Sequence, residues 1–346
     1  MTFVLILSLL TFSSQSQGIT NIIFLTNSLD SAKANFIIIG EQHTSAANPK
    51  IVIELLSHLN SECDLSTLVI EFSPSEAYLY NKFLATGDKE LLQGTIYAGT
   101  INEWTVFWEQ LYSYSQNLNS RDIIKVVGID FERPQTFAFA FNELLAGKHN
   151  IPESYDSLNK YMQSKAFKEN HSNRFPTEAD KKFMTEIRNF LVKQTSEFHS
   201  FDSLDVSFLE HTIDNHVEGF AGNREKELLL NVNKTIPDNE NIVLMLIGEG
   251  HANYKTKNFA HLLREENAYN VISGKILYNK SELWSNGFRK LNTVDELKDK
   301  PWKVYRAQFL EKIKGNFSFI DLSDYSDLSR YYDYIIIASE QKGLTY

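Results

Sequence analysis

The chain has 346 residues, of which 34 are Lys or Arg and 44 are Asp or Glu, so its formal net charge is −10. An acidic chain is poorly suited to nucleic acids or anionic membranes, and we expect neither as a partner. The single cysteine excludes an internal disulfide and a zinc site built from cysteines. With 42% hydrophobic residues and only 15 glycines, the chain can form a large core, so we expect a folded protein whose partners are small-molecule substrates or ligands.

The N-terminus contains a run of ten almost entirely apolar residues, 3–12, followed by small and polar residues. The run is too short to span a membrane, which takes about 20 residues, and it resembles the core of a secretory signal peptide. No Lys or Arg precedes it, so a buried first strand is the alternative. We expect residues 1–17 to be a signal peptide and the protein to be exported (periplasmic, secreted or envelope-associated), or cytoplasmic if the run is a strand. No later segment is long enough to predict an integral membrane helix in the mature chain.

Up to residue 131 the chain alternates between short apolar runs and amphipathic segments. The apolar runs are continuous, which is typical of strands buried on both faces of a sheet. They cover residues 36–39, 68–70 and 123–127. The amphipathic segments predict helices over residues 49–59, 73–87 and 103–118. Asn48 is a suitable N-cap for the first helix, with Pro49 as its first residue, and Gly87 ends the second.

From residue 135 to about residue 236 the strand pattern is absent, and the sequence predicts helices broken near Pro152 and Pro176. A helix opening at Arg224 then leads back to strands, which cover residues 242–247, 271–277 and 334–337. This order is typical of an α/β fold whose mostly parallel or mixed sheet is flanked by helices. We therefore predict one domain over 18–346, with a helical insertion, or cap, over about 135–236.

A short motif occurs twice, each time directly after a predicted strand. The motifs are Gly40-Glu41-Gln42-His43 and Gly248-Glu249-Gly250-His251. In parallel α/β sheets, ligands bind beyond the carboxyl ends of the strands. Histidine and glutamate move protons near neutral pH or bind metals. We predict that His43 and His251 share one site; the alternative is a coincidence of two polar surface turns.

Two further strands end in acids, Glu71 and Asp130. If all four strands are parallel, these carboxylates meet both histidines at one edge of the sheet, where they would fix the imidazole tautomer and raise its basicity. Asp130 could instead cap a helix ahead of Pro134. Glu71 ends a strongly apolar run, so it needs a buried partner or a functional reason.

Arg224 opens a helix ahead of the second motif, where it could support an anionic group or an oxyanion. The alternative is a surface ion pair with Glu225 or Glu227. Glu249 is expected to point away from the site because side chains alternate at a strand end. Cys63 lies beside two acids, which raise the pKa of a thiol, so it is a poor nucleophile. The other seven histidines have no partner pattern and are interpreted as ordinary: His58, His149, His171, His199, His211, His216 and His261.

The order of these motifs resembles the superfamily that contains erythromycin esterases, ChaN-like haem-binding proteins and Tiki proteases. The resemblance covers roughly residues 35–280 and includes Glu103-Trp104 and Asn223-Arg224-Glu225. It implies an α/β sandwich with a site at the strand ends. In erythromycin esterases a histidine after the first strand is the general base, a role that falls to His43. Residues that orient water and support the ester match Glu71 and Arg224, and His251 matches the late site histidine.

Two departures bring the sequence closer to the ChaN-like and Tiki forms: one residue, not two, separates Glu41 from His43, and the second motif holds one histidine. Tiki-type members are metal-dependent and ChaN-like members bind haem. We expect a hydrolase that cleaves an ester, lactone or amide. His43 would activate water, and Glu41 or Glu71 would orient His43. Arg224 and His251 would stabilise the oxyanion or protonate the leaving group.

Asp130 and Trp104 are expected to contact substrate. The site could act without a metal, or His43, His251 and Glu71 could bind a divalent metal (Zn, Mn or Fe); the sequence leaves both alternatives. The alternatives to a hydrolase are a haem- or iron-binding protein without activity, and a scaffold that has lost its chemistry.

Overall fold

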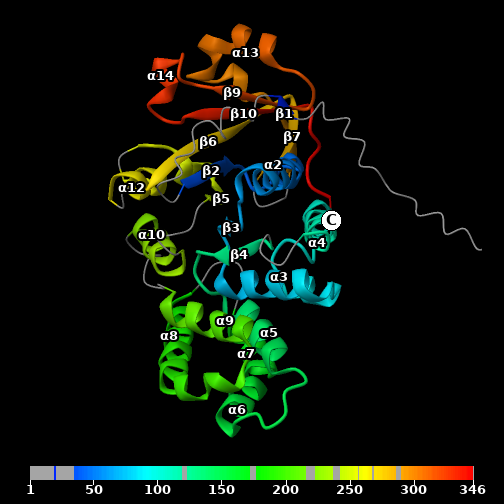
Figure 1. Ribbon diagram of the computed structural model, residues 1–346, viewed down its shortest axis with the longest axis vertical. Helices are drawn as coiled ribbons and strands as arrows, with labels where there is room; N and C mark the ends of the chain where they lie inside the picture. Colours follow the sequence, from blue (N-terminus) through cyan, green and yellow to red (C-terminus); the bar gives the residue numbers. More distant parts are fainter. Residues whose placement is uncertain are drawn as a thin grey trace, which may run out of the picture.

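The computed structural model describes residues 19–20, 35–118, 123–171, 177–215, 223–236, 242–255, 257–266, 269–285 and 290–345. The expected signal peptide, Pro176 and His216 lie outside them. Figure 1 shows the molecule as two layers along its long axis: a β-sheet with its helices, and a group of helices at one end. Among the described residues, no helix combines the length and the apolar character that crossing a bilayer requires.

The central sheet has eight strands in the order β1-β9-β10-β6-β2-β5-β3-β4. All neighbouring pairs are parallel except β9 and β10, so the predicted α/β class with a mostly parallel sheet is confirmed. The strands are β1 (Ile19–Thr20), β2 (Asn35–Glu41), β3 (Thr67–Ile70), β4 (Lys125–Gly128), β5 (Ile242–Gly248), β6 (Asn270–Asn279), β9 (Phe317–Asp321) and β10 (Tyr334–Ser339). A separate hairpin joins β7 (Ser281–Ser285) to β8 (Lys290–Val294).

The six predicted strands are present, and the sequence pattern missed four others: β1, the hairpin strands β7 and β8, and β9, in which Ser318 interrupts the apolar run. The central strands are buried on both faces, as their continuous apolar sequences predict. In β2, Ile37 and Ile39 belong to one core, whereas Phe36 and Ile38 belong to the other. Because β2, β5, β3 and β4 lie side by side in this order and are parallel, their carboxyl ends share one edge of the sheet.

Helices cover both faces of the sheet. One face carries α2 (Ala47–Cys63), α3 (Pro74–Thr86) and α4 (Asn102–Ser115); the other carries α10 (Arg224–Thr235), α11 (Glu249–Ala252), α12 (Phe259–Glu266), α13 (Arg306–Lys312) and α14 (Ser326–Ser329). Ser73 caps α3 by accepting from the Glu76 N–H at 3.2 Å, and Gly87 ends it at a φ of 74°, as predicted. The prediction that Asn48 caps α2 is wrong. The helix begins at Ala47, and the Asn48 amide bonds a site residue instead.

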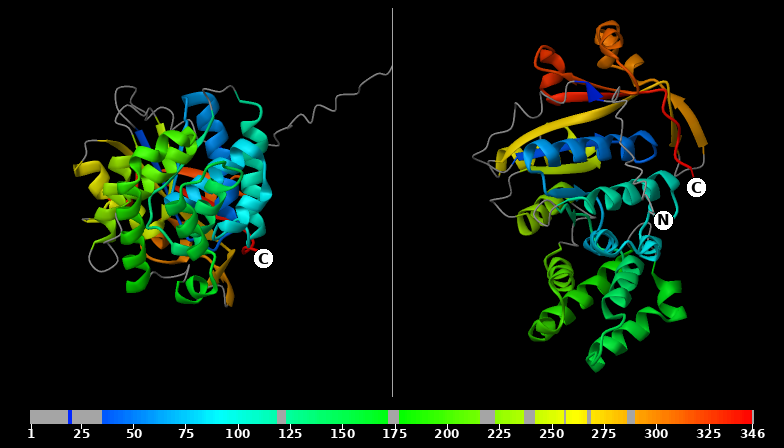
Figure 2. Two further views of the ribbon diagram at one scale, coloured as in Figure 1. Left: turned by 90° about the horizontal axis from the view of Figure 1, so that it is seen from below. Right: turned by 45° about the vertical axis from the view of Figure 1, so that its right-hand side comes forward.

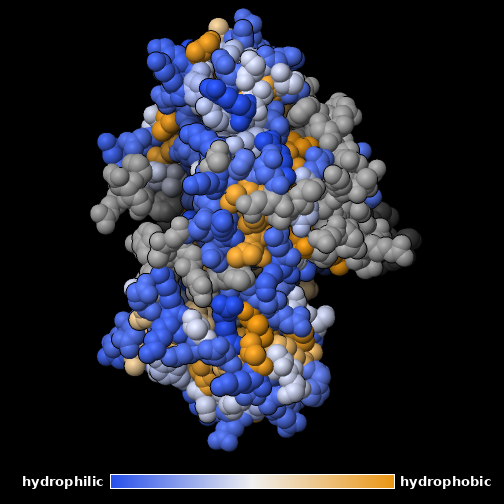
Figure 3. Space-filling view, turned by 90° about the vertical axis from the view of Figure 1, so that its left-hand side faces the viewer, coloured by the Kyte–Doolittle hydropathy of each residue, from blue (hydrophilic) through white to orange (hydrophobic). Residues whose placement is uncertain are grey.

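The helical stretch consists of α5 (Pro134–Leu145), α6 (Glu153–Met162), α7 (Lys165–Asn170), α8 (Glu178–Lys193) and α9 (Ser203–Asp214), with α10 closing it. In Figures 1 and 2, α5 to α9 form the end layer, which we call the cap, whereas α10 lies against the sheet. The core of the α2–α4 face continues into the cap, where Tyr78 of α3 stacks on Phe208 of α9 at 4.5 Å. The aromatic residues of the cap therefore mostly pack a core. On the face drawn in Figure 3 the surface is largely hydrophilic, with apolar residues gathered near its middle.

Candidate functional site

The carboxyl ends of three neighbouring strands bring the two motifs together. In the register of β2 and β5, Glu41 is opposite Gly248, and in that of β3 and β5, Ile70 is opposite Leu246. The chain continues from β3 to Glu71, whose N–H donates to the Leu246 carbonyl at 3.2 Å. The residues that follow these strands therefore surround one small volume at the sheet edge.

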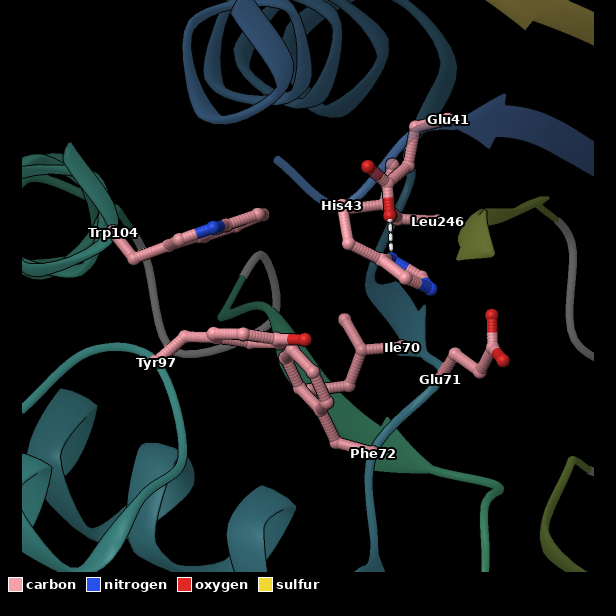
Figure 4. Close-up of a pocket in the computed structure, with 8 residues that line it drawn as sticks. All are labelled: Glu41, His43, Ile70, Glu71, Phe72, Tyr97, Trp104 and Leu246. Carbon is pink, nitrogen blue, oxygen red and sulfur yellow. Dashed lines mark hydrogen bonds and ion pairs between the residues drawn. The ribbon is translucent and has the colours of Figure 1, made fainter. Parts of the chain in front are cut away.

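Glu41 and His43 form a hydrogen-bonded pair within the first motif, drawn in Figure 4. Oε1 of Glu41 faces Nδ1 of His43, so Nε2 is the ring atom that faces the rest of the site. Glu41 is 4% exposed, whereas 46% of the His43 side chain is exposed and accessible from solvent. The negative charge of Glu41 is the main reason that the pKa of His43 is raised from 6.5 to about 9.

The Glu41 carboxylate is held from behind by a network that sequence reasoning missed. Asn48 donates to Oε2 of Glu41 and, at 2.7 Å, to the Gln42 carbonyl. The Tyr278 hydroxyl donates to Oδ1 of Asn48 at 2.7 Å and accepts from the Gln42 N–H at 3.1 Å. Asn48 and Tyr278 are both fully buried. In the sequence, an asparagine at the start of a helix predicts a capping residue. That Asn48 instead holds Glu41 follows only from the tertiary structure.

His251 forms the second histidine–carboxylate pair, but with a partner from another element. Its Nδ1 lies 2.7 Å from Oε1 of Glu225 on α10, and its Nε2 lies 3.4 Å from Oε1 of Glu71. Burial lowers the pKa of His251, but the hydrogen bonds and charges of both carboxylates outweigh it and raise the pKa to about 9. Glu249 points away, as its position predicts, and pairs with Lys275.

Glu71 is the anion at the centre of the site. Its Oε1 lies 2.7 Å from Nη2 of Arg224, and its Oε2 accepts from the Gly248 N–H at 2.5 Å. Burial by itself raises the pKa of a carboxyl, but the His251 hydrogen bond and the charges of His43, His251 and Arg224 lower the pKa of Glu71 to about 2. Glu71 therefore remains ionised throughout the neutral range.

Behind Glu71, positive and negative side chains alternate from Arg224 to Glu76. Nη2 of Arg224 is 3.1 Å from Oδ2 of Asp130, which is 3.6 Å from Nη2 of Arg133. Nη1 of Arg133 lies 3.3 Å from Oε2 of Glu76 on α3. Asp130 is 2% exposed, and its carboxylate pairs with both arginines. Asp130, which we expected to contact substrate, does not line the pocket beside Glu71. The alternatives for Arg224 and Asp130, a surface pair and a helix cap, do not describe the contacts seen.

A small pocket that is open to solvent lies beside these groups. Figure 4 shows its lining side chains, which come from the ends of β2, β3 and β5, from the segment before α4, and from α4 itself. They are Glu41, His43, Ile70, Glu71, Phe72, Tyr97, Trp104 and Leu246. Trp104, which we expected to contact substrate, lines the pocket together with Glu41, His43 and Glu71. Arg224 and His251 do not line the pocket, but both contact Glu71, which does.

The donor set does not favour a metal ion. Over the part of the chain that the structure describes, no group of three or more His, Cys, Asp or Glu is arranged to hold one. The Arg224 guanidinium occupies the Glu71 oxygen that faces His251. Metal binding by these three residues stays a prediction, as does haem.

Comparisons with known proteins show that the chain shares its fold with solved structures. No family model matches the sequence, and no curated protein matches it. Three solved structures, each 13% identical to this chain, share its fold. They are a Bacillus cereus protein (TM-score 0.63, 92% of this chain and 91% of that one), a succinoglycan biosynthesis protein (0.61, 92% and 91%) and a mutant of erythromycin esterase EreC in its open conformation (0.53, 92% and 93%). The expected erythromycin esterase-like fold is therefore confirmed.

Proposed function

We propose that this protein is a hydrolase that activates water with His43 and cleaves an ester, lactone or amide. The observation that carries the proposal is the Glu41–His43 pair, whose imidazole lines a pocket together with the Glu71 carboxylate. A carboxylate on Nδ1 fixes the tautomer in which neutral Nε2 can accept a proton. The fold shared with erythromycin esterase EreC, an esterase by name, supports the same reaction class.

The reaction needs one proton acceptor and one source of positive charge. The water oxygen attacks the carbonyl carbon while a water proton passes to Nε2 of His43. This step forms the new C–O bond and leaves an oxyanion on the former carbonyl oxygen. Collapse of this intermediate breaks the bond to the leaving group, and that oxygen or nitrogen takes the proton from the imidazolium of His43. The products are the acid and the alcohol or amine, so atoms and charge balance without a further reactant.

His251 and Arg224 would supply the positive charge. Both contact Oε1 of Glu71, and the raised pKa of His251 keeps its imidazole protonated at neutral pH. Cations held close to a developing oxyanion stabilise it without reorganisation. Glu71, with a pKa of about 2, would hold both cations in place and accept from the attacking water. Glu41 would orient His43.

The test is hydrolysis of a panel of generic esters, lactones and amides by the purified protein and by His43→Ala. We expect turnover by the wild type and a loss of about 10²–10⁴-fold in His43→Ala, which is the usual contribution of a general base. His199→Ala, which changes an exposed histidine of the cap, is the matched control and should keep full activity. Circular dichroism would show that both variants fold.

The haem-binding alternative predicts different results from the same samples. A haem titration would then give an absorption band near 400 nm that His43→Ala or His251→Ala abolishes, and no substrate would be turned over. Metal analysis of the purified protein and assays after chelator treatment test the divalent metal. The hydrolase proposal fails if no substrate of the panel is hydrolysed, or if His43→Ala retains wild-type turnover.

A further inference from the structure

The first turn of α10 brings two neighbouring residues to the site, and only one of them has a role in the proposed reaction. Arg224 pairs with Oε1 of Glu71, whereas Oε1 of Glu225 lies 2.7 Å from Nδ1 of His251. His251 in turn approaches Oε1 of Glu71 through its Nε2, at 3.4 Å. The contacts therefore close a ring from Glu71 through α10 to His251 and back. Glu225 is the member of this ring that the proposed function does not use.

The Glu225 carboxylate is held on its other side by the main chain of a second helix. Its Oε2 accepts from the Phe259 N–H at 2.7 Å. Phe259 is the first residue of α12, which lies beside α10 in Figure 1, and its side chain is fully buried in the core on that face of the sheet. With one oxygen on α12 and the other on His251, the carboxylate is fixed at both ends. An ordinary acid in the first turn of a helix is solvated and interacts mainly with the helix dipole.

The contact with Glu225 decides which proton of His251 faces Glu71. In the charged ring, the Nδ1–H donates to Glu225 and the Nε2–H faces Glu71. A carboxylate beside Nδ1 keeps the proton on that nitrogen, so the proton that the ring releases or regains is the one on Nε2. Glu225 also favours the charged ring: burial lowers the pKa of His251, but the hydrogen bonds with Glu225 and Glu71 raise it to about 9.

We propose that Glu225 is the positioning residue of His251, which it holds with Nε2 towards Glu71 and keeps in its charged form. The effect on turnover rests on the proposed function, whereas the orientation and charge of the imidazole depend on no substrate. Glu225 does not line the pocket, so it acts on the reaction only through His251. Its removal should therefore lower kcat and leave KM unchanged.

The first test follows the ring nitrogens of His251 by proton–nitrogen NMR over a pH series, with the signals assigned by their absence from His251→Gln. In the wild type we expect Nδ1 to remain protonated while Nε2 titrates. In Glu225→Gln we expect the midpoint of the His251 titration to fall by about one unit or more, which is the usual effect of an adjacent carboxylate. Glu227→Gln removes the same charge from the same turn of α10 and is the control, in which the midpoint should stay as in the wild type.

The second test measures kcat and KM with the best substrate of the ester, lactone and amide panel. We expect Glu225→Gln to lower kcat about tenfold or more with KM unchanged, because a misplaced reacting group reduces the rate. The double variant Glu225→Gln/His251→Gln should lose no more than His251→Gln alone, since the effects of residues that act as a unit are not additive.

Glu225→Asp keeps the charge but is one methylene too short to hold both partners, so it should restore part of the rate that Glu225→Gln loses. If Glu225→Gln does not fold, Glu225→Asp takes its place in the pH series. The midpoint of the His251 titration should then fall as well, by a smaller amount, and an unchanged midpoint would count against the contact.

The outcomes separate this inference from the proposed function. An unchanged His251 titration in Glu225→Gln, an equal shift in Glu227→Gln, or losses of kcat that add in the double variant would overturn the inference and leave the hydrolase intact. Failure of the wild type to hydrolyse any ester, lactone or amide would instead count against the proposed function, and the NMR series would still decide the role of Glu225.

Discussion

Nε2 of His251 lies 3.4 Å from Oε1 of Glu71, while Nδ1 of the same ring is held by Glu225. The Glu41–His43 pair approaches the same carboxylate from another strand. A Cβ placed on Gly248 would lie 3.2 Å from Oε2 of Glu71 and 3.4 Å from Nε2 of His43. Two histidine–carboxylate pairs thus face one permanent anion, an arrangement that suits a base on one side and an acid on the other.

The pH dependence of kcat/KM should report both histidines. His43 must be unprotonated to act as base, whereas His251 must be protonated to stabilise the oxyanion, and both pKa values are about 9. We expect a narrow bell with its maximum near pH 9, because activity rises as His43 loses its proton and falls as His251 loses its own. His251→Gln should lower the maximum and remove the alkaline limb, while His43→Ala should remove activity at all pH values. A maximum below pH 7 would contradict these roles.

Replacing the central anion should change both the rate and the pH profile. Glu71→Gln removes a negative charge that raises the pKa of His43 and of His251. We expect kcat/KM to fall about 10²-fold, since Arg224 and His251 lose their anchor, and the pH optimum to move down by about one unit. Glu265→Gln, at an exposed surface pair with Arg264, is the control. An unchanged pH optimum in Glu71→Gln would show that Glu71 does not act on the histidines.

Much of this arrangement could be predicted from the sequence because it depends on strand order. Continuous apolar runs identify the parallel strands, and a residue directly after such a strand, such as His43 or Glu71, must lie at the sheet edge. Contacts that depend on tertiary packing could not be predicted. The partner of His251 is Glu225 on a separate helix, and not the Glu249 of its own motif. Asn48 carries a capping signal in the sequence, although in the fold its amide holds Glu41.

The network behind Glu41 is testable through Tyr278, whose hydroxyl bonds Asn48. Tyr278→Phe leaves a buried amide oxygen without its donor, so the free energy of unfolding should fall by about 1–3 kcal/mol. Because Glu41 is then held less firmly, we also expect kcat to fall by up to about tenfold, or roughly 1.4 kcal/mol in the barrier, and the pKa of His43 to shift.

The matched control is Tyr334→Phe, which removes an equally buried hydroxyl bonded to the Ile38 carbonyl at 2.7 Å, away from the site. It should lose stability to denaturant but keep kcat and the pH profile. If Tyr278→Phe and Tyr334→Phe differ in neither kcat nor pH profile, Tyr278 serves stability alone.

Gly248 tests whether the volume between Glu71 and His43 is where the chemistry occurs. Its φ is −55°, an ordinary value for any residue, so Gly248→Ala introduces no backbone strain. The new methyl group would nevertheless contact Oε2 of Glu71 and Nε2 of His43, where the attacking water must lie. We expect kcat/KM to fall about 10²-fold, as a small misplacement of reacting groups commonly does, with little loss of stability. Gly250→Ala, where an added Cβ meets nothing within 4 Å, is the control in the same motif and should keep its activity. Wild-type activity in Gly248→Ala, measured alongside its melting temperature, would place the reaction elsewhere.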